Sequence, residues 1–154
     1  MALRNIVTEG DEVLTKRCRP VERFDTHLKT LIQDMKETLL RADGVGLAAP
    51  QVGILRRLAL VRDEVDENRI FVLVNPSIIA FSGRQTPVEG CLSIPGIWGK
   101  TVRPATVTVR AQDENGTWFE VTRGGITAVC FCHELDHLDG KLFREHVTEY
   151  VEPN

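Results

Sequence analysis

Two histidines and a glutamate near the carboxy-terminal end of the sequence form a group that could do chemistry. His133 and His137 are four positions apart, and Glu134 follows the first histidine directly. On a helix with about 3.6 residues per turn, both imidazoles lie on one face and can bind the same metal ion. Glu134 projects beside them, toward a water molecule on that ion. The spacing therefore predicts the site of a metal-dependent hydrolase.

The residues around this motif predict a buried helix. Gly124-Gly125 precedes the motif and Gly140 follows it, as expected at the two ends of a helix. Apolar side chains lie on the face of the histidines and on a second face (Ile126, Val129 and Cys130; Ala128, Phe131, Leu135 and Leu138). Because buried ionisable groups are costly unless they are paired or bind metal, we expect the histidines to be ligands rather than solvated surface residues.

A catalytic metal site needs a third protein ligand and an open fourth position. Cys130 lies too far along the helix to join both histidines, and Cys132 points to a different side of it. Cys18 has no supporting context. Cys91 is the preferred third ligand, because a thiolate binds borderline metals strongly and the glycines of segment 89–96 let the chain approach. A carboxylate such as that of Glu89 is the alternative.

The remaining elements must bring this segment to the helix. Apolar residues at helical spacing predict a first helix from Asp25, its N-cap, to about Arg41. Extended runs at 57–61, 70–75 and 77–81 predict an antiparallel meander with a break at Asn75-Pro76, and 105–111 and 118–121 predict a hairpin around Asn115-Gly116. Segments 43–51 and 89–96 are expected to be irregular, with a short tail after Gly140. The expected fold is α+β, with antiparallel sheets packed around a central buried helix.

Length and composition place limits on the class of protein. The sequence has 154 residues, 42% of them hydrophobic and 27% charged, which fits a single domain over 1–154. The net charge of −3 without a basic run argues against nucleic-acid binding. No apolar run approaches the roughly 20 residues of a membrane span, and no signal peptide is visible. Four unevenly spaced cysteines suit a reducing compartment, so we expect a cytosolic protein without a membrane partner.

Three short segments together resemble the motifs of the peptide deformylase family. Gly44 to Gln51 is similar to the family's Gly-x-Gly-x-Ala-Ala-x-Gln loop, Glu89 to Ser93 reads Glu-Gly-Cys-Leu-Ser, and His133 to His137 reads His-Glu-x-x-His. They occur in the family's order, and the similarity covers nearly the whole chain. The resemblance implies removal of the formyl group from the N-terminal formyl-methionine of new polypeptides, with release of formate. It also implies a bacterial cytoplasmic location.

The family resemblance also implies roles for individual residues. Cys91, His133 and His137 would hold the metal, and Glu134 would act as general base and then protonate the leaving amine. The Gln51 side-chain amide and the Leu92 backbone N–H would meet the oxyanion. The substrate residues implied are Val45, Ile126, Val129 and Cys130 for the methionine side chain, with Gly46 and the backbone around Gly90 pairing with the extended peptide. Glu89 would be anchored by an arginine, for which Arg103 is the candidate.

The implied cofactor is one divalent ion. Ferrous iron is expected in the cell and Zn²⁺, Ni²⁺ or Co²⁺ in purified protein, since a His2Cys site accepts all four. Two departures from the family pattern stand out. Cys132 replaces a glutamine that many relatives carry, which removes a hydrogen bond near the site. The sequence also ends soon after Gly140, where many bacterial relatives continue into a helix used in ribosome docking, so docking by that route is not expected.

Two rival hypotheses use the same residues. A metallopeptidase or another amide hydrolase could carry the same His-Glu-His helix, although a cysteine as third ligand is unlike a conventional zinc peptidase. A non-catalytic metal-binding protein would have a closed site with four protein ligands. The combination of Glu134, Gln51 and Leu92 favours the enzyme.

Overall fold

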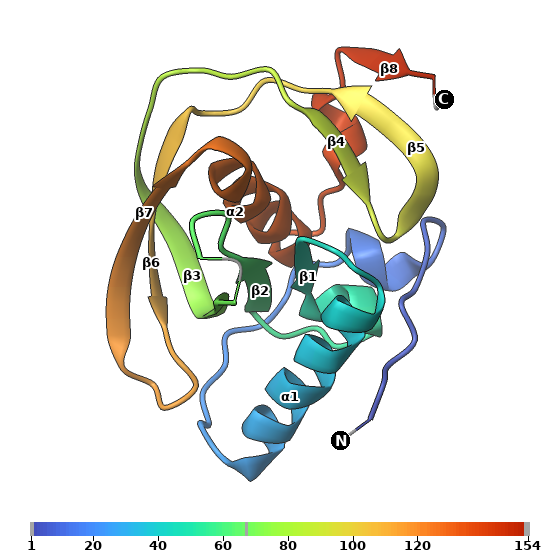
Figure 1. The fold of residues 1–154 in the computed structure, drawn as a ribbon. Coiled ribbons are helices and arrows are strands. Elements are labelled where there is room, and N and C mark those ends of the chain that lie inside the picture. The colour runs from blue at the N-terminus through green and yellow to red at the C-terminus, as the bar shows by residue number, and fades with distance from the viewer. Residues whose placement is uncertain (1, 67, 153–154) are drawn as a thin grey trace.

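Two antiparallel sheets lie on either side of the carboxy-terminal helix in the computed structural model, which describes residues 2–66 and 68–152 (Figure 1). The larger sheet has five strands in the order β1-β2-β3-β6-β7, and the smaller has three in the order β4-β5-β8. The strands are Gly46–Ala48 (β1), Leu58–Arg62 (β2), Ile70–Ser82 (β3), Val88–Cys91 (β4), Ile94–Lys100 (β5), Thr106–Gln112 (β6), Trp118–Gly124 (β7) and Glu149–Val151 (β8). The helices are α1 (Thr26–Arg41) and α2 (Gly125–Leu138), with 3-10 turns at Glu12–Thr15 (η1), Ala49–Val52 (η2) and Phe143–His146 (η3). The α+β class with antiparallel sheets is confirmed.

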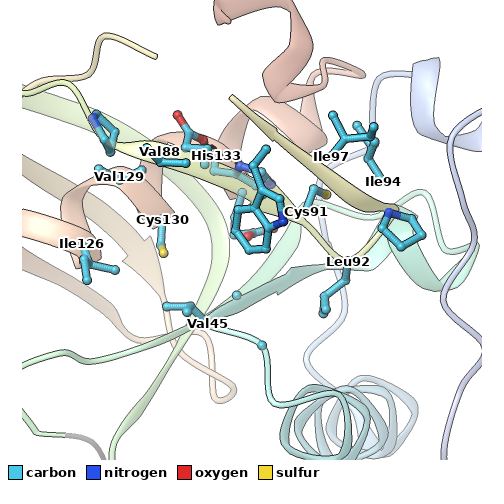
Figure 2. A pocket seen from close by; sticks show the side chains of 18 of the residues that line it. Val45, Val88, Cys91, Leu92, Ile94, Ile97, Ile126, Val129, Cys130 and His133 are labelled. Atoms are coloured by element: carbon cyan, nitrogen blue, oxygen red, sulfur yellow. Dashed lines mark hydrogen bonds and ion pairs between the residues drawn. The ribbon is translucent and has the colours of Figure 1, made fainter. Parts of the chain in front are cut away.

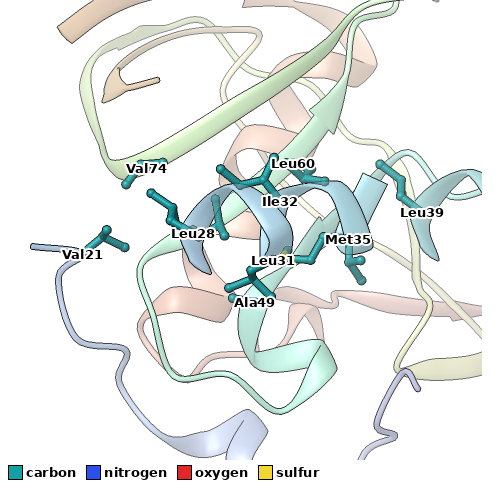
Figure 3. Close-up of a cluster of buried hydrophobic side chains, with 11 residues drawn as sticks. Val21, Leu28, Leu31, Ile32, Met35, Leu39, Ala49, Leu60 and Val74 are labelled. Atoms are coloured by element: carbon teal, nitrogen blue, oxygen red, sulfur yellow. The ribbon is translucent and has the colours of Figure 1, made fainter. Parts of the chain in front are cut away.

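Helix α1 begins and ends where the sequence predicts. The Asp25 side chain accepts a hydrogen bond of 3.1 Å from the Leu28 N–H, which caps the helix. The apolar face of α1 is buried against β1 and β2, as Figure 3 shows for Leu28, Leu31, Ile32, Met35, Leu39 and their neighbour Leu60. This face contains no group with a chemical role, so α1 supports the sheet that carries the site.

Strand β2 separates the two helices. Leu58 and Leu60 pack in the cluster with α1, whereas Val61 packs in the cluster with Phe131 of α2. Alternate residues of a strand point to opposite faces, so the helices cover opposite faces of β2. Helix α2 is therefore buried on its sheet side and has the central position that its two apolar faces predict. None of the helices in the described residues is long and apolar enough to cross a membrane.

The predicted break at Asn75-Pro76 is wrong, because β3 runs through it as one strand. Asn75 has a positive φ of 50°, and the register with β6 shifts between Val74 and Ser77. The Asn75 amide accepts a bond of 2.8 Å from the Val21 N–H and donates bonds of 2.9 Å to the Val21 carbonyl and 2.8 Å to the Gln112 side chain. These three bonds hold a bulge in place, so the strand bends and continues.

The expectation that segments 43–51 and 89–96 are irregular is also wrong for most of their residues. Gly46–Ala48 forms β1, and η2 carries Gln51. Residues 88–100 form the β4–β5 hairpin, in which Cys91 lies opposite Ile94. The expected tail contains η3 and β8, which pairs with β5. The β6–β7 hairpin is confirmed, although β7 continues to Gly124. Cys91, Gln51 and the two histidines thus stand on regular elements, which fix them more firmly than loops would.

Candidate metal centre

Three side chains from two elements converge at the buried end of α2. Helix α2 supplies His133 and His137, both buried, and the end of β4 supplies Cys91. One donor atom of each lies within 4.8 Å of the others, and Cys91 Sγ is 3.5 Å from His137 Nε2. Two imidazoles and a thiol at this spacing match the ligand set of a site with an open fourth position. The structure brings together the three residues that the sequence singles out.

The hydrogen bonds of His133 determine which of its nitrogens faces the donor cluster. Its Nδ1 lies 2.9 Å from Oε1 of Glu89, which is 4% exposed. With Nδ1–H donated to that carboxylate, Nε2 is left as the nitrogen that could bind a metal. His137 also turns Nε2 toward Cys91, and its buried Nδ1 has no hydrogen-bond partner within residues 2–66 and 68–152. Both rings thus offer a nitrogen to one ion.

Glu89 is held by a buried network. Arg103 donates to it through Nε at 2.7 Å and through a terminal nitrogen at 3.1 Å, which confirms the predicted pairing, and Thr101 donates as well. Arg103 also donates to Asp136 at 3.0 Å. Burial raises the pKa of Glu89, but the bonds from His133 and Arg103 outweigh burial and lower it to about 2. Glu89 is therefore ionised and can fix the His133 ring.

The charges around His133 favour a cation. Burial lowers the pKa of His133, but the Glu134 carboxylate and the bonds to Cys91 and Glu89 raise it more, and the pKa lies well above its usual value. Burial instead lowers the pKa of His137 to about 3, which keeps this ring neutral as a ligand must be. The raised pKa of His133 shows that positive charge is favoured at this point of the site. A divalent ion held by the His133 and His137 imidazoles and the Cys91 thiol would supply that charge.

Glu134 follows His133 on α2 and is 4% exposed. Burial raises its pKa to about 7, and no group in the described part of the chain bonds to its Oε1. A carboxylate with a pKa near neutrality suits a general base. A Cβ on Gly46 would lie 2.5 Å from Glu134 Oε2, so only glycine at this position lets the carboxylate lie against β1.

The Gln51 amide also faces the ligand cluster. Its Oε1 accepts a bond of 2.9 Å from the Ala48 N–H, and its Nε2 donates 3.1 Å to Ser93 Oγ and lies 3.6 Å from Cys91 Sγ. The Ala48 bond assigns the oxygen and leaves the NH2 group on the side of Cys91. Sequence reasoning missed Ser93, although it lies in the same motif as Cys91.

An apolar cavity of about 520 Å³ opens next to these residues. Figure 2 shows Ile126, Val129 and Cys130 on its helix side, Cys91 and Leu92 on its hairpin side, and Val45 at its edge. Trp98 is a lining residue that sequence reasoning missed. A Cβ on Gly90 would lie 2.4 Å from its ring, so Gly90 is needed for the indole to cover this strand. All six predicted substrate residues line the cavity.

Cys132 does not belong to the ligand set. It is buried in the apolar cluster between α2 and the large sheet, together with Phe131 and Leu135. Burial raises the pKa of its thiol to about 11. It fills space in the apolar core.

A donor set of two buried imidazoles and a half-buried thiol, a buried carboxylate with a raised pKa and an adjoining apolar cavity are the features of a metal-dependent hydrolase. The family model for polypeptide deformylase matches residues 3–152. Peptide deformylase 2 of Clostridium acetobutylicum is 49% identical to this chain, and the aligned region covers 98% of this chain and 99% of that protein. The peptide deformylase of Caldicellulosiruptor bescii is 48% identical, over 98% of this chain and 89% of that protein. The crystal structure of a Legionella pneumophila peptide deformylase superposes with a TM-score of 0.90 at 46% identity, covering 95% of this chain and 86% of that one.

The chain belongs to the peptide deformylase family. Members of this family are metal-dependent hydrolases that remove the formyl group from the N-formyl-methionine of nascent peptides.

Proposed function

We propose that Cys91, His133 and His137 hold the catalytic ion and that Glu134 is the general base of deformylation. The observation that carries this proposal is the convergence of the three donor atoms within 4.8 Å, next to a buried carboxylate oxygen with no partner in the described residues. When bound, the ion supplies Lewis-acid activation of a water molecule.

Glu134 takes the proton of the attacking water and passes it to the leaving amine. Burial raises the pKa of this carboxyl group, which makes it a better proton acceptor than an exposed glutamate. The oxyanion that forms on the formyl group accepts hydrogen bonds from the Gln51 amide and the Leu92 N–H. The bond from the Ala48 N–H to Gln51 Oε1 orients that amide before the substrate arrives, which is the requirement for electrostatic stabilisation.

The apolar cavity receives the methionine side chain. We propose that Val45, Ile126, Val129 and Cys130 contact it, since an unbranched thioether packs well among such residues. Gly46 and Gly90 pair through their backbones with the extended peptide. Both glycines also have packing reasons to be small, because Glu134 and Trp98 lie against them. We propose that residues 1–154 form one catalytic domain, which supplies the metal ligands, the general base, the oxyanion donors and the substrate contacts.

Ferrous iron is the ion that we propose for the cell, with Zn²⁺, Ni²⁺ or Co²⁺ able to replace it, because the His2Cys donor set accepts these ions. Metal analysis of protein prepared without oxygen tests the choice, and less than one iron per chain there would contradict it. The place of action that we propose is the bacterial cytoplasm, where formylated nascent chains are made; the two curated relatives named above come from bacteria.

The test of these roles combines metal analysis with turnover of formyl-Met-peptides. Cys91→Ala is expected to lose the ion. Glu134→Ala is expected to keep it while turnover falls by at least about two orders of magnitude. Full metal content in Cys91→Ala would show that another group is the third ligand, and unchanged turnover in Glu134→Ala would remove its role as base. Acetylated and unblocked peptides serve as controls, and cleavage of internal bonds alone would indicate the metallopeptidase instead.

A further inference from the structure

The short helix η3, which follows α2, contacts the metal centre directly through Phe143. The Phe143 ring stacks on the His133 ring, with centroids 5.8 Å apart and planes 24° from parallel. Phe143 is 2% exposed, so its ring has little freedom to move. In Figure 1 η3 is the short red helix that lies behind β4, near β8. The face of an imidazole ligand is thus covered by an aromatic ring from another element.

A second side chain of η3 reaches His133 through a chain of polar contacts. His146 Nε2 lies 3.3 Å from Asp136 Oδ2, the same oxygen that accepts the 3.0 Å bond from Arg103. Arg103 in turn donates to Glu89, and Glu89 accepts the hydrogen bond from His133 Nδ1–H. His146 therefore stands at the outer end of the network whose inner end is the ligand, and its side chain is 41% exposed.

We propose that η3 is a positioning element for the metal centre, in which Phe143 fixes the plane of the His133 ring and His146 fixes Asp136 and, through Arg103, the Glu89 carboxylate. The proposal rests on the ligand set proposed above. The two constraints are complementary. Stacking limits tilt of the ring, and the Nδ1–H bond limits its rotation about Cβ–Cγ, so together they leave Nε2 one direction in which to point.

The two residues differ in how closely they act. Phe143 touches the ligand, so its truncation to Leu is expected to speed loss of the ion by at least about tenfold, the scale of residues that orient a metal ligand. His146 acts through two intervening side chains. For His146→Ala we expect about a threefold faster loss, the scale of residues that modulate a network from outside the site. Phe143 and His146 are positioning residues and touch neither the ion nor the substrate.

The experiment measures metal release and ligand geometry rather than activity. Wild-type protein, Phe143→Leu and His146→Ala are loaded with Co²⁺. Transfer of the ion to a chromophoric chelator gives the release rate, and the visible absorption spectrum reports the geometry around Co²⁺. Phe24→Leu is the matched control for the aromatic truncation, because Phe24 packs in the cluster with α1 and not at the site. His27→Ala is the control for the histidine, since its side chain is fully exposed.

We expect faster release and a shifted Co²⁺ spectrum in both η3 variants and in neither control. Thermal unfolding of the metal-free proteins separates positioning from stability. A variant that unfolds earlier but releases Co²⁺ at the wild-type rate with the wild-type spectrum would show that its residue is only structural and would overturn its part of the proposal. A wild-type chain that binds no Co²⁺ would contradict the ligand set itself, and this inference with it.

Discussion

Gly46 shows how one missing side chain permits the placement of Glu134, the proposed general base. In Gly46→Ala the new Cβ would lie 2.5 Å from Glu134 Oε2 and 2.9 Å from its Cδ, so the carboxylate must move away from β1. A displacement of about 1 Å costs roughly two orders of magnitude in rate, so we expect a loss of that size in kcat/KM with the metal retained. Steady-state kinetics with a formyl-Met-peptide measure it.

Gly124→Ala is the matched control, because the added Cβ would lie 3.2 Å from the Ala105 carbonyl oxygen and does not contact Glu134. Its activity should remain close to that of the wild type. Full activity in Gly46→Ala would mean that Glu134 has room to adjust, and that the close packing against β1 does not set its position.

Gln51 offers a second test at the level of one residue. Gln51→Glu keeps the shape of the side chain but replaces the NH2 donor by an acceptor on the side of Cys91. Loss of an oxyanion donor costs about 10²- to 10³-fold in kcat, so we expect a fall of this size with a smaller change in KM.

Ser93→Ala removes only the hydroxyl that accepts from Gln51 Nε2, while the bond from the Ala48 N–H remains. Its kcat should therefore fall less than that of Gln51→Glu. Equal losses in the two variants, or a change confined to KM in Gln51→Glu, would argue against an oxyanion role for the amide.

Among the secondary-structure elements, β3 is a long strand of the large sheet that contains a bulge at Asn75. Asn75 combines a positive φ of 50° with three hydrogen bonds that tie β3 to the segment at Val21 and to Gln112 of β6. Asn75→Ala removes these three hydrogen bonds. It also leaves alanine in a backbone conformation of positive φ that asparagine tolerates better. We expect a loss of about 1–3 kcal/mol in the free energy of unfolding.

Urea unfolding at neutral pH measures this loss. Asn75→Gly tolerates the positive φ and should lose less than Asn75→Ala, because only the hydrogen bonds are missing. Asp43→Gly is the control for the backbone effect, since Asp43 has a φ of 52° with an exposed side chain. If Asn75→Ala were as stable as the wild type, the bulge would be held by the strands alone.

Across the whole molecule, the sequence predicts the groups that local spacing defines. The histidines and Glu134 share a motif whose helical period places them together, and the Asn-Gly turn defines the β6–β7 hairpin. Spacing alone does not select Cys91: its choice over Glu89 depends on the affinity of a thiolate for such metals and on the glycines beside it. The contacts of Phe143 and His146 with the site could not be predicted, because they depend on where η3 packs and no period or motif encodes that position. The continuity of β3 was missed for a related reason: Asn75-Pro76 resembles a turn until distant Val21 and Gln112 bind the amide.

Asp63 links distant parts of the chain and gives a pH dependence to the stability of the whole molecule. It follows β2, is 2% exposed and accepts two bonds from Arg123 of β7, of 3.1 and 3.0 Å, as well as one from the Val65 N–H. The bonds from Arg123 outweigh burial and hold the pKa of Asp63 below its usual value. A carboxyl group with a lowered pKa in the folded state stabilises the fold above its unfolded pKa of about 3.9, and this stabilisation is lost as the pH falls through the folded pKa.

Asp63→Asn should therefore be less stable than the wild type at pH 7, and the difference should shrink as the pH falls below about 4, where Asp63 of the unfolded chain begins to take up a proton before Asp63 of the folded chain does. Urea unfolding midpoints at several pH values from neutral to strongly acidic measure both curves. Asp43→Asn, whose side chain is 95% exposed, is the matched control and should follow the wild type throughout. If the unfolding midpoints of wild type and Asp63→Asn instead differ by the same amount down to acidic pH, the substitution acts through packing and not through the loss of the Asp63 charge. Convergence of the two curves, with Asp43→Asn unchanged, would assign this acid-sensitive part of the stability to the Asp63–Arg123 ion pair.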